Sequence, residues 1–367
     1  MIHSFFPEKD STIYEYMPNK NTGLDEILEL QKQKYESRTG SIGVSVPKDF
    51  ESRILIKFKS SEISSFLTDN NINIDSASFV LNLYVASQYE VPFEYIIEAL
   101  PVSGSWLNGT GRYDGSEISD GVTWASINGL TSSLWDTGSV GKYWYNVNEG
   151  GGNWYTSPIA TASFTQASGG DLQLNVTQHV KNWINNVIPN DGFIVKLESS
   201  SFIQASFPTT NLAYYSNNTT TVYSPQLQIF WNTGSYSSSL ATMTFRDNPI
   251  VYIPNLKSEY KQNTKNRIYL GTRPKYPRPT FTQTNAYATT KVLPNTSYYQ
   301  IVDAHTLEPI IPYSDYTKIS ADNSGSYFDF WTSPFYPERW YRFEFKVMYT
   351  DSTEYYVGNE YIFKVID

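Results

Sequence analysis

The chain has 367 residues, of which 16% are aromatic and 17% are charged, and it contains no cysteine. This composition is too aromatic for a disordered protein, and no apolar stretch approaches the roughly 20 residues of a membrane-spanning helix. The net charge of −9, without a basic run, makes double-stranded nucleic acid an unfavourable partner. We expect no membrane partner and no signal peptide, and the lack of cysteine favours synthesis in a reducing cytoplasm.

Strand patterns dominate the first 232 residues. In "SASFVLNLYVAS" (76–87), apolar and polar residues alternate with the period of two that is typical of a strand. The apolar positions are Ala77, Phe79, Leu81, Leu83 and Val85. Segments 53–58, 192–199 and 225–231 behave similarly. The sequence therefore predicts a fold that consists mainly of strands.

Two segments have the period of a helix. In "LQLNVTQHVKNWINN" (172–186) and the residue after it, the apolar positions recur every three to four residues, at Val176, Val180, Trp183, Ile184 and Val187. Thr177 is placed to cap this short amphipathic helix, and residues 189–192, "PNDG", are expected to end it. The segment 23–36 also fits a helix by period alone.

The segment 233–239 is rich in serine and glycine and is expected to be a linker. Strand patterns resume after it, for example in 342–349, where apolar residues alternate with charged ones. The proline-rich segment 273–281 is expected to be an extended connection.

Residues 5–232 resemble the disaggregatase-related (DNRLRE) domain through a series of landmarks in order. These are "DSTIYEYMPNKNTGLDEILELQK" (10–32), "SRILIKF" (52–58), "IDSASFVLNLYV" (74–85), "PVSGSWLNGTG" (101–111) with "DGVTW" (120–124), "LQLNVTQHVKNWIN" (172–185), "DGFIVKLES" (191–199) and "SPQLQIFW" (224–231). One departure is Asn175, where the family pattern has aspartate. The resemblance implies a jelly-roll β-sandwich whose short helix plugs one open end. It also implies that 25–32 pair as a strand, against the helical period.

Segments 214–231, 273–281, 316–330 and 337–347 resemble structural proteins of marine contractile-tailed bacteriophages, in which a DNRLRE-like domain precedes smaller β domains. The implied fold is all-β, with a jelly-roll domain at 1–232 followed by one or two small immunoglobulin-like domains, placed at 240–285 and 286–367. The implied function is that of a non-enzymatic structural protein in the neck, collar, tail or capsid exterior of a virion. Its expected partners are other virion proteins and copies of itself in a symmetric assembly.

Few residues point to catalysis. The three histidines are His3, expected at a frayed end, His179 in the helix and His305 in a hairpin turn. Segment 136–143 lacks the first glycine and the hydroxyl residue of a phosphate loop. An acidic loop carries the carboxylates Asp114, Glu117 and Asp120, which favour a solvated loop over a glycosidase pair. We expect no enzyme and no cofactor.

Calcium is the one metal that the sequence leaves open. Oxygen ligands for Ca²⁺ could come from the acidic loop or from Asp191. The segment 71–75 has the spacing of half a calcium loop, but the resemblance makes it the lead-in to a strand.

An aromatic segment, 134–157, is the candidate binding region. It places six aromatic residues among glycine and asparagine: Trp135, Tyr143, Trp144, Tyr145, Trp154 and Tyr155. Three interpretations remain open, which are stacking on sugar rings, an interface between subunits, and packing inside the sandwich. Sugar stacking would make the protein a carbohydrate-binding adhesin for host attachment, which is the alternative function.

Overall fold

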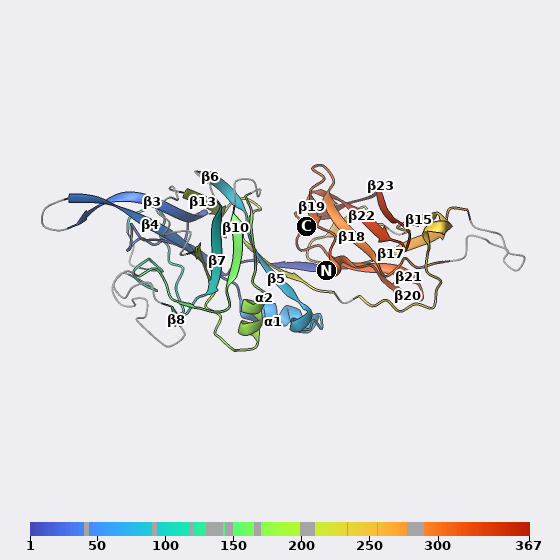
Figure 1. Cartoon of the computed structure of the whole chain (residues 1–367), viewed down its shortest axis with the longest axis horizontal. Coiled ribbons are helices and arrows are strands. Elements are labelled where there is room, and N and C mark those ends of the chain that lie inside the picture. Colours follow the sequence, from blue (N-terminus) through green and yellow to red (C-terminus); the bar gives the residue numbers. More distant parts are fainter. Residues whose placement is uncertain are drawn as a thin grey trace, which may run out of the picture. The chain divides into compact units, whose positions relative to one another are not determined.

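The computed structural model describes residues 1–39, 44–89, 94–117, 120–129, 142–143, 150–164, 170–198, 210–232, 234–254, 256–276 and 290–367 (Figure 1). The predicted all-β fold is confirmed, since most regular structure is strand. The chain divides into two compact units. The N-terminal unit is Phe5–Gln228, and the C-terminal unit combines Met1–Ser4 with Ile229–Asp367.

A large sheet forms the body of the N-terminal unit. Its strand order is β10 (Ala160–Phe164), β7 (Tyr95–Pro101), β12 (Phe193–Leu197), β4 (Val44–Lys57), β3 (Ile27–Thr39), β13 (Thr210–Tyr215) and β6 (Val85–Tyr89), and β2 (Lys9–Tyr14) also pairs with β4. The strand assignment of 25–32 is confirmed from Ile27 onward. The helical period of this segment does not produce a helix because Ile27–Lys32 pair with β13 and Lys32–Thr39 pair with β4.

A four-stranded sheet has the order β1 (Ile2–Phe5), β14 (Gln226–Phe230), β5 (Ser78–Leu83) and β11 (Leu172–Asn175). The predicted burial of Phe79, Leu81 and Leu83 in β5 is confirmed. The alternation does not hold throughout, because Asn82 is also buried and Val85 belongs to the next strand, β6. A short two-stranded piece joins β8 (Lys142–Tyr143) to β9 (Trp154–Tyr155). The described 3₁₀ turns are η1 (Ile74–Ser76), η3 (Phe245–Asp247) and η5 (Asp315–Thr317).

Helix α2 (Thr177–Ile184) confirms the predicted amphipathic helix. Val176 occupies the N-cap position, and Thr177 lies inside the helix. Instead of capping the helix, the Thr177 hydroxyl accepts the backbone N–H of Phe79 in β5 at 2.8 Å. On the other side, the Trp183 ring lies 4.6 Å from that of Phe193 in β12. The helix therefore contacts a strand of each of these two sheets, β5 and β12.

Two features differ from the prediction, since a second helix, α1 (Ser60–Asp69), is present and α2 ends before Val187. Helix α1 buries only Ile63 and Leu67, one turn apart, in a serine-rich segment. Val187 was expected on the apolar face of α2, but it follows the helix and is 67% exposed. The chain turns at Asn186, whose φ of 56° is left-handed, so the helical face does not continue to Val187.

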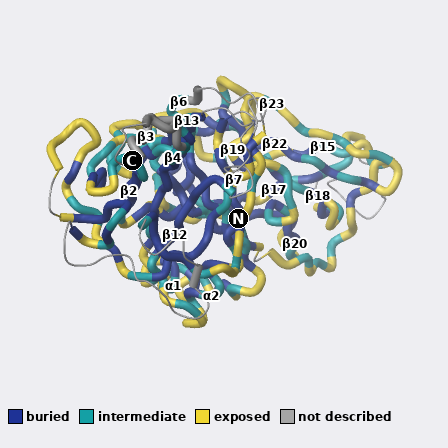
Figure 2. The backbone as a smooth tube through the Cα atoms, turned by 60° about the vertical axis from the view of Figure 1, so that its left-hand side comes forward, coloured by how far each residue is buried: buried dark blue, intermediate teal, exposed yellow. Residues whose placement is uncertain are grey.

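Strand β12 is buried along its whole length, as Figure 2 shows in dark blue. Successive side chains of a strand point to opposite faces of the sheet. Phe193 packs on Trp183, whereas Ile194 belongs to a cluster of buried residues with three tryptophans. These are Trp106, Trp124 and Trp154. The loops that carry them therefore cover the face of the large sheet opposite α2.

The C-terminal unit contains two further sheets. One has the order β15 (Pro249–Tyr252), β17 (Lys265–Pro274), β21 (Gly325–Trp331) and β20 (Ser320–Asp322). The other has the order β16 (Glu259–Lys261), β23 (Thr353–Ile366), β22 (Trp340–Met348), β18 (Ser297–Asp303) and β19 (Pro309–Ile311). Strand β16 runs parallel to β23, and the other strand pairs are antiparallel.

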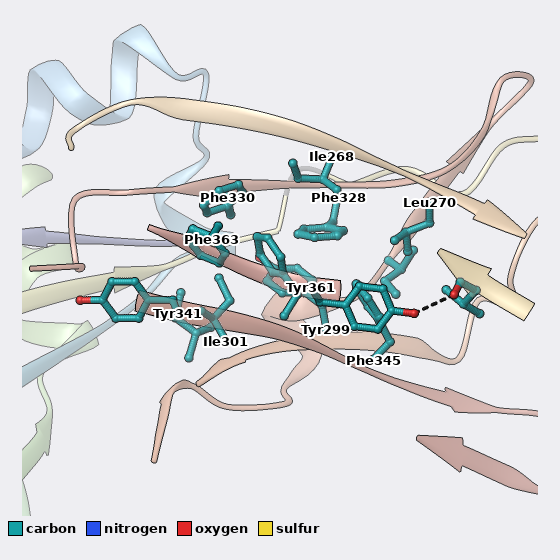
Figure 3. Close-up of a cluster of buried hydrophobic side chains, with 14 of the residues drawn as sticks. Ile268, Leu270, Tyr299, Ile301, Phe328, Phe330, Tyr341, Phe345, Tyr361 and Phe363 are labelled. Atoms are coloured by element: carbon teal, nitrogen blue, oxygen red, sulfur yellow. Dashed lines mark hydrogen bonds between the residues drawn. The ribbon is translucent and has the colours of Figure 1, made fainter. Parts of the chain in front are cut away.

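Aromatic side chains from both sheets make the core of this unit (Figure 3). Tyr299 of β18 stacks on Phe328 of β21 with 4.3 Å between ring centroids. Phe343 and Phe363, from β22 and β23, stack at 4.5 Å. The hydroxyl of Tyr361 donates to the carbonyl oxygen of Val251 at 2.7 Å, so this buried polar atom is satisfied.

The unit contains both of the segments predicted as separate domains, 240–285 and 286–367. Strand β17, in the first segment, pairs with β21, in the second. The segment expected as a linker also belongs to this unit. Ser237 donates its backbone N–H to Ala321 of β20, and Ala321 donates back to the carbonyl of Ser235. The proline-rich connection lies outside the described residues after Tyr276.

Candidate functional site

The structure places part of the predicted aromatic segment. Three of its six candidate residues lie outside the described residues: Trp135, Trp144 and Tyr145. The backbone of Tyr143 lies in β8 and pairs with Trp154 of β9. Trp154 is only 3% exposed and belongs to the core, whereas Tyr155 is partly buried.

A buried arginine occupies one face of Trp154. The guanidinium carbon of Arg53 lies 5.1 Å from the Trp154 ring and 4.6 Å from that of Trp124. Arg53 also forms an ion pair with Glu51 and donates to the carbonyl oxygen of Gly151. Because its ring is buried against this cation, Trp154 offers no stacking surface to a sugar. For this residue, packing inside the unit is the interpretation that the structure supports.

The described histidines make structural contacts. His179 is buried, and its Nε2 lies 3.1 Å from the carbonyl oxygen of Ala99. Burial lowers the pKa of His179 to about 4. His3 does not lie at a frayed end, because its Nδ1 lies 2.7 Å from the hydroxyl oxygen of Ser333. His305 lies in the predicted hairpin turn between β18 and β19.

Two of the carboxylates considered for calcium or glycoside chemistry accept hydrogen bonds from different parts of the chain. Asp120 accepts the hydroxyl of Thr110 at 3.1 Å, and Asp191 accepts the backbone N–H of Gly104, also at 3.1 Å. Glu117 is exposed. The segment 71–75 leads through η1 into β5, as the resemblance implied. Within the described part of the chain, no group of three or more histidine, aspartate or glutamate residues could hold a metal ion.

A cleft that the sequence analysis did not identify lies on the large sheet. Its volume is about 620 Å³, within the range of small-molecule sites. The residues that line it are Tyr14, Asp25, Glu26, Ile27, Glu29, Gln31, Gln33, Ser87, Tyr113, Asp114, Asn211 and Ala213. Only Asp114 was among the candidate residues, so most of this site was missed.

Three adjacent strands position the floor of the cleft. Ile27, Glu29, Gln31 and Gln33 alternate along β3 and therefore share one face. In the register with β13, Asn211 lies opposite Gln31, and Ala213 lies opposite Glu29. Strand β6 adds Ser87 opposite Ala213. The opposite face of β3 carries the buried residues Leu28 and Leu30.

Hydrogen bonds fix Glu29 in this cleft. The Tyr14 hydroxyl donates to Glu29 Oε2 at 2.5 Å, and Asn211 Nδ2 donates to Glu29 Oε1 at 3.2 Å. Burial, with the nearby Glu29 carboxylate, holds the pKa of Tyr14 well above its usual range. The phenol therefore keeps its proton and remains a donor. Tyr113 packs edge-on against Tyr14, with ring centroids 5.3 Å apart.

A second carboxylate of the cleft, that of Asp25, is held by a backbone hydrogen bond. The N–H of Tyr113 points to both carboxylate oxygens of Asp25, at 3.0 and 3.1 Å. Desolvation raises the pKa of Asp25, although this bond and the charge of Arg112 act in the opposite direction. Arg112 itself does not line the cleft, and no described lining residue is a lysine or arginine.

The alternation along β3 is the signal that could have located the cleft. Polar residues at every second position of a strand usually mark a face exposed to water. Here the loop with Tyr113 and Asp114 also lines the cleft on that face. The sequence does not reveal this because the loop lies more than 70 residues after the end of β3.

A smaller cavity, of about 460 Å³, lies in the C-terminal unit. It is lined partly by η3 and by the end of β22, with Phe245, Arg246, Met348 and Asp351 among its residues. The hydroxyl of Thr296, which also lines it, donates to the carbonyl oxygen of Met348 at 2.5 Å.

No helix in the described ranges is long and apolar enough to cross a membrane. Comparison with known proteins finds no family model and no curated protein that matches the chain. The resemblances to the DNRLRE domain and to phage structural proteins therefore stay predictions.

Proposed function

We propose that the chain is a non-enzymatic structural protein of a bacteriophage virion that acts through contacts with other proteins. The observation that supports this most is a two-stranded ribbon of the N-terminal unit, made by β3 and β4. The ribbon runs from the pair Gln33–Phe50 to the pair Thr39–Val44. Figure 1 shows it in blue, extending beyond the other strands of its sheet.

The neighbouring strands stop before the ribbon begins. Strand β13 pairs with β3 only up to Lys32, and β2 pairs with β4 only from Ser52 onward. In the described part of the chain, no third strand accompanies the ribbon. A two-stranded ribbon alone is marginally stable in water, because it has no core of its own. Contact with a partner protein would provide the missing cover.

An open strand edge in the C-terminal unit supports the same function. Strand β16 pairs with β23 only at Lys364–Ile366. Among the described residues, the earlier part of β23 therefore has a strand on one side only, β22. This part is also well exposed, with Tyr355 at 58%. Edges of this kind present free backbone donors and acceptors for pairing with another chain.

Immunogold electron microscopy of purified particles, with antibodies against this chain, tests the proposal. We expect labelling at one defined position of the particle. A shortened ribbon, in which Asn-Gly replaces residues 38–45 and joins Ser37 to Val46, should fold normally but fail to enter particles. Absence of the chain from particles would refute the proposal. Normal incorporation of the shortened form would show that the ribbon does not make the contact.

A further inference from the structure

The cleft between the Tyr113 loop and the sheet offers acceptors that have no donor. Gln31 is only 5% exposed and lines the cleft, yet its side-chain oxygen Oε1 has no hydrogen-bond partner among the described residues. A buried polar atom without a partner destabilises the fold. The Oδ1 atom of Asn211, on the neighbouring strand, is buried and unpartnered as well. Both oxygens are shielded from solvent, so the donor of a ligand reaches them only if the two amide side chains turn toward the cleft.

The charged residues of the described lining also have one sign, and Arg112, whose charge acts on Asp25, lies outside the lining. Carboxylates come from Asp25, Glu26, Glu29 and Asp114, and the described lining contains no basic side chain. The donors that reach Glu29 and Asp25 within the cleft are the neutral groups of Tyr14, Asn211 and the Tyr113 backbone. Such bonds do not neutralise a carboxylate, so a cationic group would be attracted electrostatically.

We propose that this cleft binds the guanidinium or ammonium group of an arginine or lysine side chain on a partner protein. A guanidinium has five donors and no acceptor, which complements a lining of carboxylate and unpartnered amide oxygens. The exposed Tyr113 ring adds a surface for cation–π contact. The inference rests on the proposed function only in assigning the basic group to a partner protein.

A sugar fits this lining less well. Sugar hydroxyls accept as well as donate, whereas the unpartnered atoms here are acceptors. Stacking also needs an open aromatic face, and Tyr14 is only 1% exposed, so Tyr113 is the one aromatic residue of the described lining that offers such a face.

Saturation-transfer-difference NMR on the full chain tests the binding. The probe is the blocked peptide acetyl-Gly-Arg-Gly-amide, and the control is the same peptide with citrulline, which has the shape of arginine without its charge. We expect saturation of the arginine protons at peptide concentrations up to about 10 mM, and little or none for citrulline. Raising the salt from about 50 to about 500 mM should weaken the binding.

Glu29→Gln keeps the size of the side chain and removes its charge. We expect it to weaken peptide binding about tenfold, the size of a lost charge-assisted hydrogen bond. Glu62→Gln, on exposed α1, is the matched control and should bind as the parent does. If Glu29→Gln alters the circular dichroism spectrum, Asp114→Asn, at an exposed residue, replaces it in the binding experiment. We expect a smaller loss of peptide affinity for this variant.

Equal binding of the arginine and citrulline peptides, or no binding of either, would overturn the proposal. Unchanged affinity in the folded carboxylate variants would overturn it too. A third result would also overturn it. If the neutral sugar maltotriose shows saturation that is lost in Glu29→Gln, and the arginine peptide shows none, the cleft is a sugar site. The particle-labelling experiment is independent, so failure of the proposed function and failure of this inference are distinguishable.

Discussion

Arg53 carries a full charge into the interior of the N-terminal unit. Its guanidinium lies between the Trp124 and Trp154 rings and forms an ion pair with Glu51, which is also buried. Gly151 contributes a carbonyl acceptor and has a φ of 89°. A Cβ there would lie 2.5 Å from Arg53 Nη1, so the close approach requires glycine. Gly151 thus serves a buried cation.

We expect Arg53→Met to lower the free energy of unfolding of the N-terminal unit by about 3–5 kcal/mol, because it leaves Glu51 buried without its cation. Urea denaturation measures the change. Arg112→Met, which removes an exposed arginine, should alter stability by less than about 0.5 kcal/mol. Equal effects of the two substitutions would show that the buried ion pair contributes nothing specific.

Two buried groups of the N-terminal unit, His179 and Asp10, should change its stability in opposite directions as the pH changes. The pKa of His179 is lowered from 6.5 to about 4, so its contribution to stability is lost as the pH falls from 6.5 toward 4. The pKa of Asp10 is raised by burial from 3.8 to about 7, so its contribution is lost as the pH rises from 3.8 toward 7. The two slopes largely cancel where both groups titrate.

Asp10→Asn should reveal the pH dependence of stability that His179 causes. Relative to the parent, the variant should gain stability as the pH rises from about 4 to about 7, by up to about 1.4 kcal/mol per pH unit. His179→Gln should show the opposite trend over its own range. Urea denaturation at a series of pH values measures both. Parallel pH profiles for the parent and the two variants would contradict the assignment.

Helix α2 is an element that the sequence predicted, and two of the apolar residues predicted for its buried face differ in burial. Trp183 is buried on Phe193, whereas Val187 is exposed beyond the end of the helix. We expect Trp183→Ala to cost about 3–5 kcal/mol, as a large-to-small change in a core. Val187→Ala should change stability by less than about 0.5 kcal/mol. Thermal or urea unfolding compares them, and a Trp183→Ala melting temperature equal to that of the parent would refute the role of the helix.

Elements with a strong period and a buried face could be predicted, and the candidate site could not. Strand β5 and helix α2 bury one side of a regular pattern, so their residues identify them. Helix α1 buries only two apolar residues, which is too little for a pattern. For β3, strand pairing overrides its helical period. The cleft combines β3 with a loop distant in sequence, and nothing in either segment alone indicates that they meet.

At the scale of the whole chain, the first four residues belong to the C-terminal unit, although residues 5–228 make up the other. Ile2 is buried within the aromatic core of that unit, and the His3 ring lies 5.6 Å from that of Trp331. The compact units thus do not follow the order of the sequence. A division placed at 232, as the sequence suggested, separates the C-terminal unit from residues that complete its core.

The role of this N-terminal segment can be tested with two substitutions four residues apart. Ile2→Ala should destabilise the C-terminal unit by about 2–4 kcal/mol, because it removes a buried side chain from its core. Phe6→Ala changes an exposed residue and should have little effect. Hydrogen exchange measured by mass spectrometry resolves the units, since slowly exchanging amides report their opening free energy. We expect Ile2→Ala to speed exchange in peptides from β18 and β22 more than in those from β7 and β12. Equal acceleration in both sets, or none, would mean that residues 1–4 do not stabilise the C-terminal unit specifically.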